Sequence, residues 1–491
     1  ANGGILAIEV PNFPVQNIPG GIIDYHEYPT VAADSADITK GFIEVRPSSN
    51  NGLYGDSFLL EDVIMAGDIT GTLGNGTGPR PDYYDGAYAR SVLLNVTPEY
   101  DQLRYAEPNG GIDTVDLVIN RVKFNALPNL NINQTSVATD IENTYNPGLS
   151  GTNPAYAAVL ADLFKIEDFD SYALALDQLS ADLYAGYLRS VTMAGVRFNG
   201  LIYDMAECGK GSITNELCRP EHGGPRLWVT GNYGRADTDG DEEASAFTAE
   251  QFYIAAGLDF AVSPNFVLGV AGAYLENNMD FDLYNGKIDS RGWQAGVYGN
   301  YDTGKFYLKG AVSYSDLDGD AQRTVDFRGL TSSHNPAATT FGRITGDPDV
   351  NVWAAGAEAG VRFALGANAA ITPYASLDYA HARLKRFTEQ GDPGVAGALL
   401  TIHGTDEFFA SELGVELQGQ WGNVSPYIRG GWQHNFSDDR ANFRASFANG
   451  PAASDFDIIS EDFAADAGVV EVGLAAQFSP NFNAHLGYQG R

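Results

Sequence analysis

A chain of 491 residues with a formal net charge of -34 is long enough for more than one domain. Its excess of Asp and Glu excludes nucleic acid and an anionic membrane surface as general partners, because phosphate contacts need clustered Lys and Arg. No stretch approaches the roughly 18 apolar residues of a spanning helix, and 57 Gly, 26 Tyr and 26 Phe against 2 Cys describe an exported chain of short strands.

Residues 1–124 alternate strand-like runs with turns rich in Gly, Asn and Pro, as in GGILAIEV, GFIEVRP and DTVDLVINRVKF. Strands at intervals of roughly 10 to 20 residues predict either the end of a parallel β-helix or a small β-sandwich. We expect the natural polypeptide to contain further residues upstream.

One stretch in this region, Gly55-Asp56-Ser57-Phe58, is similar to the serine block of GDSL-type esterases. That chemistry needs the serine at the end of a buried apolar strand and a histidine with an aspartate before it. SSNNG precedes the block here, and His26 in DYHEY is the nearest histidine, so an esterase is the weaker interpretation.

Residues 125–169 mix polar turns with one expected short helix, Ala155 to Phe164, and are interpreted as a linker. From Asp170 to Cys208 the apolar period changes to 3.6, which predicts an amphipathic helix. The alternative is a helix packed on a soluble domain. The residues assigned to this helix are Leu176, Leu179, Leu183, Tyr187 and Arg197.

Two cysteines follow, Cys208 and Cys218, in CGKGSITNELC. In an exported protein a disulfide is favoured over free thiols or a metal pair. It would close a short loop and stabilise the fold by about 2 to 3 kcal/mol.

Residues 225–491 alternate apolar and polar positions in strand after strand, for example in FYIAAGLDF and GVVEVGLAAQF. The opposite face is polar, aromatic residues lie near strand ends, and short turns such as SPN alternate with long loops. These features predict an antiparallel outer-membrane β-barrel rather than a soluble all-β domain. We count about eleven strands; since such barrels have an even number and no open edge in lipid, we expect one more strand beyond this sequence.

A helix directly before a barrel can occupy its polar lumen. Small residues on the lumen face would leave room for a helix of roughly 10 to 12 Å diameter. The residues assigned to this wall are Gly257, Gly269, Gly296, Gly356 and Gly414.

Two long loops carry alternating carboxylates, which can converge on a hard cation. Neither has the full calcium-loop spacing, so solvated loop acid is the preferred interpretation and divalent-ion bridging to lipopolysaccharide the alternative. The weak metal candidates are Asp237, Asp239, Asp241, Asp316, Asp318 and Asp320. We expect no catalytic residue, no metal site and no cofactor.

Several segments in order, LVINRVKF, NINQTSVA, ALDQLSADLYAGYLRSVTMAGVRFNGLI, RLWVTGNYGRADTDGD, YIRGGWQHNF and AHLGYQGR, resemble the translocation unit of classical (type Va) autotransporters of Gram-negative bacteria, from about Leu117 to Arg491. The resemblance implies a twelve-stranded outer-membrane barrel with a helix in its pore. It also implies a chain that exports and anchors its own N-terminal passenger at the cell surface, and no enzymatic role.

The same resemblance divides the chain into a passenger stem (1–124), a linker (125–169), a pore helix with a disulfide loop (170–224) and the barrel (225–491). It implies outer-membrane lipid, lipopolysaccharide and the barrel-assembly machinery as partners of a monomeric barrel. The family's usual Gly-Glu is Ala181-Asp182 here, which we interpret as a mild change on a helix surface. Asn199 stands without the second asparagine of self-cleaving members, so we expect the passenger to stay attached. A porin-like channel and a passenger-borne hydrolase remain the alternatives.

Overall fold

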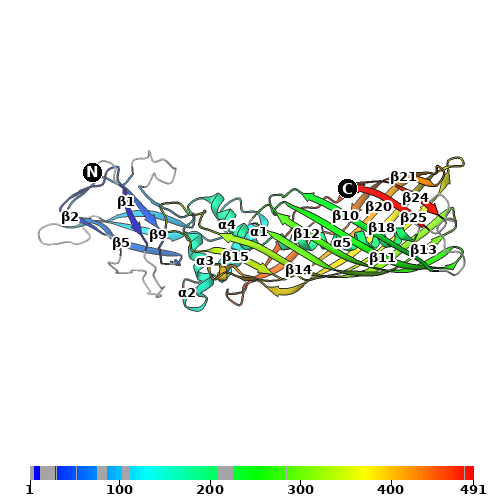
Figure 1. Ribbon diagram of the computed structural model, residues 1–491. Coiled ribbons are helices and arrows are strands. Elements are labelled where there is room, and N and C mark those ends of the chain that lie inside the picture. The colour runs from blue at the N-terminus through cyan, green and yellow to red at the C-terminus, as the bar shows by residue number, and fades with distance from the viewer. Residues whose placement is uncertain are drawn as a thin grey trace.

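The computed structural model describes residues 5–10, 28, 30–50, 52–74, 86–101, 111–206, 225–283, 285–438, 440–479 and 482–490. The molecule is elongated (Figure 1): an N-terminal β-rich part leads through a group of short helices to a large curled sheet with one long helix inside it. The predicted fold class, an all-β barrel with an internal helix, is confirmed.

The N-terminal part contains parallel strand pairs, as expected for stacked coils of a β-helix. β1, β4 and β7 form one parallel sheet, β2 pairs with β5, and β3 pairs with β6. An antiparallel layer, β5-β9-β8, follows. The strands are β1 (Ile5–Glu9), β2 (Val31–Ala33), β3 (Ala36–Asp37), β4 (Phe42–Arg46), β5 (Ser57–Ala66), β6 (Ile69–Thr70), β7 (Ala87–Ala89), β8 (Leu94–Asp101) and β9 (Asp113–Arg121).

Four helices between this part and the large sheet are named the helical cap here: α1 (Ile132–Thr144), α2 (Leu149–Thr152), α3 (Pro154–Phe164) and α4 (Phe169–Ser180). Asn131 and Gln134 form a capping box at the start of α1, and the Asp168 side chain accepts from the Ser171 N–H at the start of α4. Of these, α3 corresponds to the expected short helix and α4 to the start of the helix expected from Asp170, whereas α1 and α2 were not predicted.

The large sheet is antiparallel along the path β10-β11-β12-β13-β14-β16-β18-β20-β21-β24-β25. Within the described residues the path has eleven strands, and β10 and β25 each pair on one side only. The strands are β10 (Pro225–Thr238), β11 (Phe247–Ser263), β12 (Phe266–Phe281), β13 (Lys287–Asp302), β14 (Phe306–Asp326), β16 (Val350–Val361), β18 (Ala369–Thr388), β20 (Leu400–Gly419), β21 (Val424–Asn435), β24 (Asp466–Ser479) and β25 (Phe482–Gly490).

The long loops are more ordered than expected, because they form further strands at the end of the sheet that faces the cap. β15 extends the pairing of β14 and contacts β19, while β22 pairs with β20 and β23. These elements are β15 (Phe341–Gly346), β19 (Gln390–Gly391), the 3-10 helix η2 (Pro393–Ala398), β22 (Asn442–Phe447) and β23 (Phe456–Ile459). At the opposite end, β17 (Phe363–Ala364) pairs with the start of β18 in the short connection after β16.

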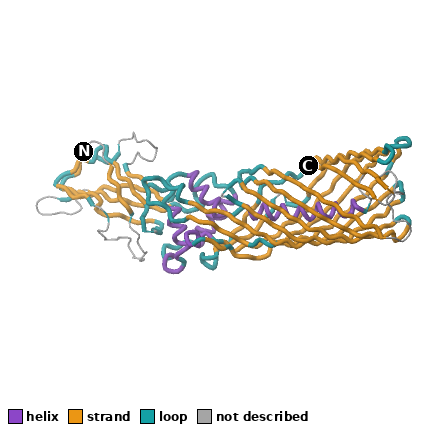
Figure 2. The backbone as a smooth tube through the Cα atoms, in the orientation of Figure 1, coloured by secondary structure: helices purple, strands orange, loops and turns teal. Residues whose placement is uncertain are grey.

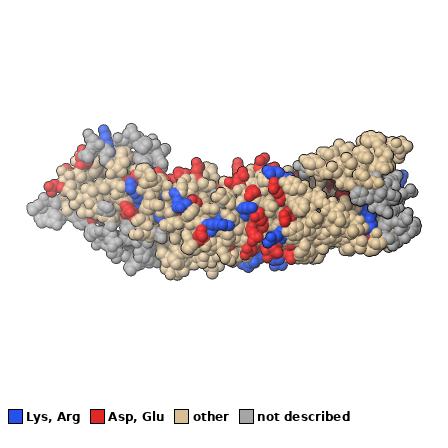
Figure 3. Space-filling view, in the orientation of Figure 1, with Lys and Arg blue, Asp and Glu red and all other residues tan. Residues whose placement is uncertain are grey.

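The outer face of the sheet carries exposed apolar side chains, whereas the alternate residues point into the lumen and are buried. Aromatic rings mark the two edges of this apolar zone. On β14 they are Tyr314, which packs between Trp293 and Trp353 with tilted rings, and Phe306 near the short turns, about 27 Å apart along the strand. Lys, Arg, Asp and Glu gather in a band beyond this zone (Figure 3).

None of the helices among the described residues combines the length and the apolarity that a membrane-spanning helix needs.

The helix expected from Asp170 to Cys208 is two helices, α4 and α5 (Leu183–Met205). Ala181 between them has a left-handed backbone with a φ of 54°, so the chain turns there. The turn separates the cap from the lumen, which the continuous 3.6 period of the sequence did not indicate.

Candidate functional site: the occupied lumen

The helix α5 runs along the inside of the curled sheet (Figure 2) and contacts strands on several sides of it, including β11–β14, β16, β18 and β20. Its side chains are buried nearly all around. Leu188, Val191, Phe198 and Ile202 are fully buried against the wall. A 23-residue helix of roughly 35 Å therefore fills the passage from the cap to the end with the short turns.

At the cap end, a buried ion pair connects α5 and the cap to the wall. The Arg323 guanidinium donates to both oxygens of Glu389 at 2.8 Å, and the Tyr184 hydroxyl donates to Glu389 Oε1 at 3.0 Å. Arg323 also donates to the carbonyl of Gln178 in α4 at 2.6 Å. One arginine thus contacts the wall, the cap and, through Glu389, the lumen helix.

In the middle of the lumen, both arginines of α5 contact the wall. Arg189 lies 3.1 Å from the Asp406 carboxylate and donates to the Asp438 carbonyl at 3.1 Å. Arg197 donates to Gln251 Oε1 at 2.6 Å. The guanidinium groups of both helix arginines are thereby paired with polar groups of the sheet and its loops.

At the end with the short turns, a chain of charges joins the last turn of α5 to three wall strands, β14, β16 and β21. The Lys309 ammonium lies 2.7 Å from Asp204 of the helix and 3.1 Å from Glu358, and Arg429 lies 2.5 Å from the same Glu358. Arg226 also donates to the Met205 carbonyl. Because Lys309 and Glu358 are buried, this network is costly to break.

Two glycines let α5 approach the wall closely. A Cβ on Gly195 would lie 2.7 Å from Val352 Cγ1, and one on Gly186 would lie 3.1 Å from Phe247 Cε1. Larger side chains at these positions would push the helix from the wall.

The five glycines assigned to the lumen wall divide into two groups. Gly296 lies against Ile202 of α5, and Gly356 lies against Asn199. The other three lie under aromatic side chains of the wall itself, which fill the lumen beside the helix: Gly257 under Trp228, Gly269 under Tyr298 and Gly414 under Tyr374. The residue opposite each glycine on the neighbouring strand determines to which group it belongs. The spacing of residues along one strand does not reveal that neighbour.

The residues assigned to the pore helix are likewise divided. Leu183, Tyr187 and Arg197 lie in α5. Leu176 and Leu179 lie in α4, outside the lumen, because of the turn at Ala181.

The outer loops hold the cap by hydrogen bonds to buried side chains. The Asp162 carboxylate in α3 accepts from the Thr339 and Thr340 N–H groups at 2.8 and 2.7 Å, and Lys165 lies 2.7 Å from its other oxygen. In α1, Asn133 donates to the carbonyls of Glu243 and Ile459, at 2.8 Å each. Sequence reasoning missed α1 and these contacts because α1 is polar and its partners are distant in sequence.

The N-terminal strands are joined to the cap by Arg90. Arg90 lies 2.7 Å from both Glu44 in β4 and Glu167 before α4. Burial alone would raise the pKa of Glu44, but hydrogen bonds from Arg90, Tyr88 and Arg46 outweigh it and lower this pKa to about 2.

Two carboxyl groups where the cap meets the loops have pKa values that are raised rather than lowered. Burial, with Asp182 and Asp241 nearby, raises the pKa of Glu461 to about 7, and its Oε1 has no hydrogen-bond partner in the described part of the chain. Burial also raises the pKa of Asp177 in α4 to about 6, despite a hydrogen bond from Gln134.

The remaining candidates are placed as follows. Cys208, Cys218 and His26 lie outside the described residues. Ser57 is exposed at the start of β5, and Asp56 beside it pairs with Arg121 at 2.8 Å.

The acidic candidates are engaged in other contacts: Asp237 pairs with Arg235, Asp241 with Arg440, and Asp316 with Lys385. Asp239, Asp318 and Asp320 lie among the exposed residues. Across the described ranges, no three His, Cys, Asp or Glu side chains are arranged to hold a metal ion.

An apolar outer face, aromatic edges and a buried helix in the lumen define an outer-membrane β-barrel protein. The family model of the autotransporter β-domain matches residues 227–489, so the chain belongs to that family. It is an outer-membrane translocator protein with its passenger at the cell surface. The expected family and location are confirmed, and the matched domain is a translocator rather than an enzyme.

The chain is also similar in sequence to individual proteins. The chain is 26% identical over 267 residues to the "Extracellular serine protease" of Serratia marcescens, covering 54% of this chain and 24% of that protein. It is 28% identical over 137 residues to the "Probable outer membrane protein PmpD" of Chlamydia trachomatis, covering 28% and 8%. The chain thus spans a quarter or less of these relatives.

Among solved structures, the translocator domain of the autotransporter NalP from Neisseria meningitidis is similar, with 13% identity, a TM-score of 0.47 and coverage of 63% of this chain and 93% of that one.

Proposed function

We propose that α5 and the helical cap keep the passenger stem, residues 1–124, attached to the barrel after export and close the passage behind it. The translocator role follows from the family. Retention and closure rest on one observation, the buried network Asp204–Lys309–Glu358–Arg429, which ties the last turn of α5 to the wall.

The division proposed for the chain is a stem (1–124), a linker that contains most of the cap (125–169), the turn and lumen helix with the cysteine loop (170–224) and the barrel (225–491). The barrel-assembly machinery is the proposed partner during insertion. Lipopolysaccharide is the proposed lipid partner of the mature protein. We assign no catalytic residue, since Ser57 lies exposed at the start of a strand.

The proposal is tested by single-channel conductance in planar bilayers. The intact protein should conduct little, because a helix and three layers of polar contacts fill the lumen. A variant lacking Leu183–Met205 should form an open pore. A high, steady conductance of the intact protein would favour the porin-like alternative instead.

A control variant lacks only α2, Leu149–Thr152, in the cap. It shortens the chain outside the lumen and should stay closed. Both variants should show the heat-dependent mobility of a folded barrel, so that a misfolded protein is not taken for a closed one.

A further inference from the structure

The densest basic run of this acidic chain lies near the cap end of β18. The segment HARLKR, His381–Arg386, holds three of the 29 Lys and Arg residues. Charge summed over the whole chain argues against an anionic partner. The local excess of Lys and Arg on this strand favours an anionic partner.

A bulge turns this run outward. The register between β18 and β20 shifts between Leu384 and Phe387. Leu384 is buried on the lumen side, whereas the side chains of Lys385 and Arg386 both point away from the lumen. Bulges commonly redirect a side chain in this way. Arg383 and Arg386 are consequently exposed on the same outer face.

The neighbouring strands add a histidine and a further arginine to this run. Arg386 lies 3.4 Å from His403 of β20, and His403 is in register with Arg444 of β22. The basic patch is defined by residues on three adjacent strands: Arg383, Lys385, Arg386, His403 and Arg444.

Two members of the basic patch have no carboxylate to neutralise them. Lys385 lies 3.1 Å from Asp316, and Arg444 lies 2.9 Å from Asp457. Arg383 and Arg386 form no ion pair with any carboxylate in the described part of the chain. Their guanidinium groups are therefore available to bind an external anion.

The basic patch begins directly outside the aromatic edge of the apolar zone. On β18, His381 is in register with Trp353, and Arg383, one outward step along, is in register with Asn351. Aromatic rings mark the interface of the bilayer, so the next step outward is the level of lipid phosphates.

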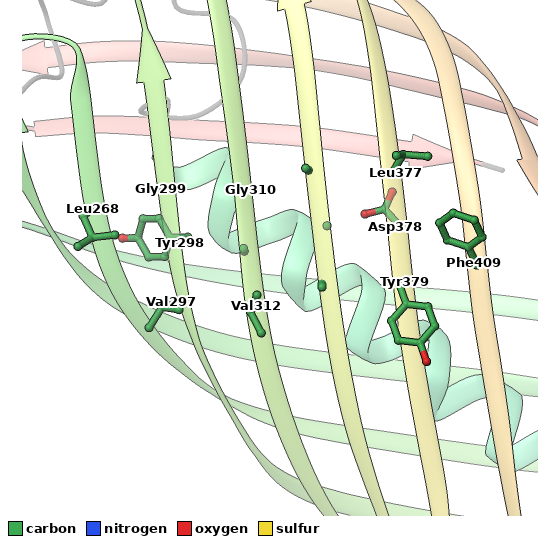
Figure 4. Close-up of a pocket in the computed structure, with 14 residues that line it drawn as sticks. Leu268, Val297, Tyr298, Gly299, Gly310, Val312, Leu377, Asp378, Tyr379 and Phe409 are labelled. Carbon is green, nitrogen blue, oxygen red and sulfur yellow. The ribbon is translucent and has the colours of Figure 1, made fainter.

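An apolar groove lies on the lipid side of the same strand. Its volume is about 490 Å³, and Figure 4 shows its lining with α5 behind the strands. Tyr379 borders the groove about 13 Å from Arg383 along β18. Small side chains form its floor and larger ones its rim: Leu268, Val297, Gly310, Ala357, Tyr379 and Phe409.

We propose that this surface binds a phosphorylated glycolipid of the outer leaflet, lipopolysaccharide through its lipid A part. Arg383 and Arg386 bind phosphate oxygens, and one acyl chain lies in the groove beneath Tyr379. Free guanidiniums are the preferred partners of phosphate. A basic patch three strands wide fits a head group that carries more than one phosphate. This inference rests on the proposed partnership with lipopolysaccharide and gives it a site, but it does not rest on closure of the lumen.

The test measures binding of purified lipid A to the full-length protein in phosphatidylethanolamine nanodiscs, by native mass spectrometry. Replacing both arginines, Arg383→Gln with Arg386→Gln, should weaken binding about tenfold or more, since each charge-assisted hydrogen bond is removed. Filling the groove with Ala357→Leu should also weaken it.

Matched controls are available for both changes. Arg235→Gln removes an arginine just beyond Tyr233, but one that already pairs with Asp237 and Glu250. Ala359→Leu enlarges the next outward-facing position on β16, outside the groove lining. Both should bind lipid A as the unchanged protein does.

Three results would each overturn the proposal: unchanged binding in the double arginine variant, unchanged binding in Ala357→Leu, or binding of phosphatidylglycerol as tight as that of lipid A. The last result would show that any anionic lipid suffices. The heat-dependent mobility of each folded variant separates lost binding from lost folding.

Discussion

The Lys309 ammonium lies 2.7 Å from the carboxylate of Asp204, joining β14 of the wall to the last turn of α5. Replacing Lys309 by Met leaves Asp204 and Glu358 without this cation inside the barrel. We expect a loss of about 3 to 5 kcal/mol in stability and a higher conductance, because an unpaired buried charge is costly.

The control for this variant is Lys287→Met, which removes an exposed lysine that pairs with Asp289 at 3.1 Å. Exposed ion pairs contribute little to the free energy of unfolding. The thermal unfolding and the conductance of this variant should therefore stay as in the unchanged protein. Equal effects of the two substitutions would contradict the role assigned to Lys309.

Gly195 sets how closely α5 approaches β16. Gly195→Leu would place atoms within the volume of Val352 and should cost about 1 to 3 kcal/mol. Thermal melts should show the loss, and adding Val352→Ala should restore part of it. Gly200→Ala, whose Cβ has 3.8 Å of clearance, is the matched control. No difference between Gly195→Leu and that control would argue against close packing.

Asp162 fastens the cap to the loop before β15. Asp162→Ala leaves the buried Lys165 unpaired and removes the acceptor of two backbone N–H groups. We expect hydrogen exchange in α3 to become faster by a factor that corresponds to about 3 kcal/mol or more. Asp170→Ala, in the exposed first turn of α4, should leave exchange in α3 as it was.

The pH dependence of the cap follows from Glu461. Its pKa is about 7 in the folded protein against an ordinary 4.5, so the protonated carboxyl favours the folded state. That stability is complete below about pH 4.5 and is lost as the pH rises through about 7. Limited proteolysis should release the cap more readily at pH 8.5 than at pH 5.5.

Glu461→Gln should remove much of this difference, which is on the order of 1 to 3 kcal/mol. The exposed Glu99 of β8 provides the control, Glu99→Gln, and should leave the difference in place. A Glu461→Gln protein with the full pH response would assign that response to another group.

The barrel strands were predictable because alternation along a strand reports which face meets lipid. Phe252 and Ile254 are exposed on the outer face as their spacing indicates. The helix before the barrel was also predictable from its 3.6 period, although the turn at Ala181 was not, since Ala has no propensity for a left-handed backbone.

The contacts that hold the lumen helix could not be predicted. Lys309 and Asp204 are paired only because β14 and the end of α5 meet in space. The first helix of the cap, α1, was missed for a related reason. Asn133 is buried in α1, although a polar residue ordinarily indicates solvent, because residues more than 100 positions away, Glu243 and Ile459, supply its partners.

The central claim, that α5 occupies the lumen of the mature barrel, is tested most directly by a disulfide between helix and wall. The Cβ positions of residues 195 and 352 lie 3.6 Å apart, within the range of a disulfide. The test protein carries Gly195→Cys and Val352→Cys, with Cys208 and Cys218 replaced by Ser. It would be oxidised in isolated outer membranes, and mass spectrometry would identify the linked peptides.

We predict that most of the protein carries this crosslink. A pair of Gly195→Cys with Ala355→Cys should stay reduced, because Ala355 points to the lipid side of β16. Absence of the crosslink between residues 195 and 352 in folded barrels would contradict the account.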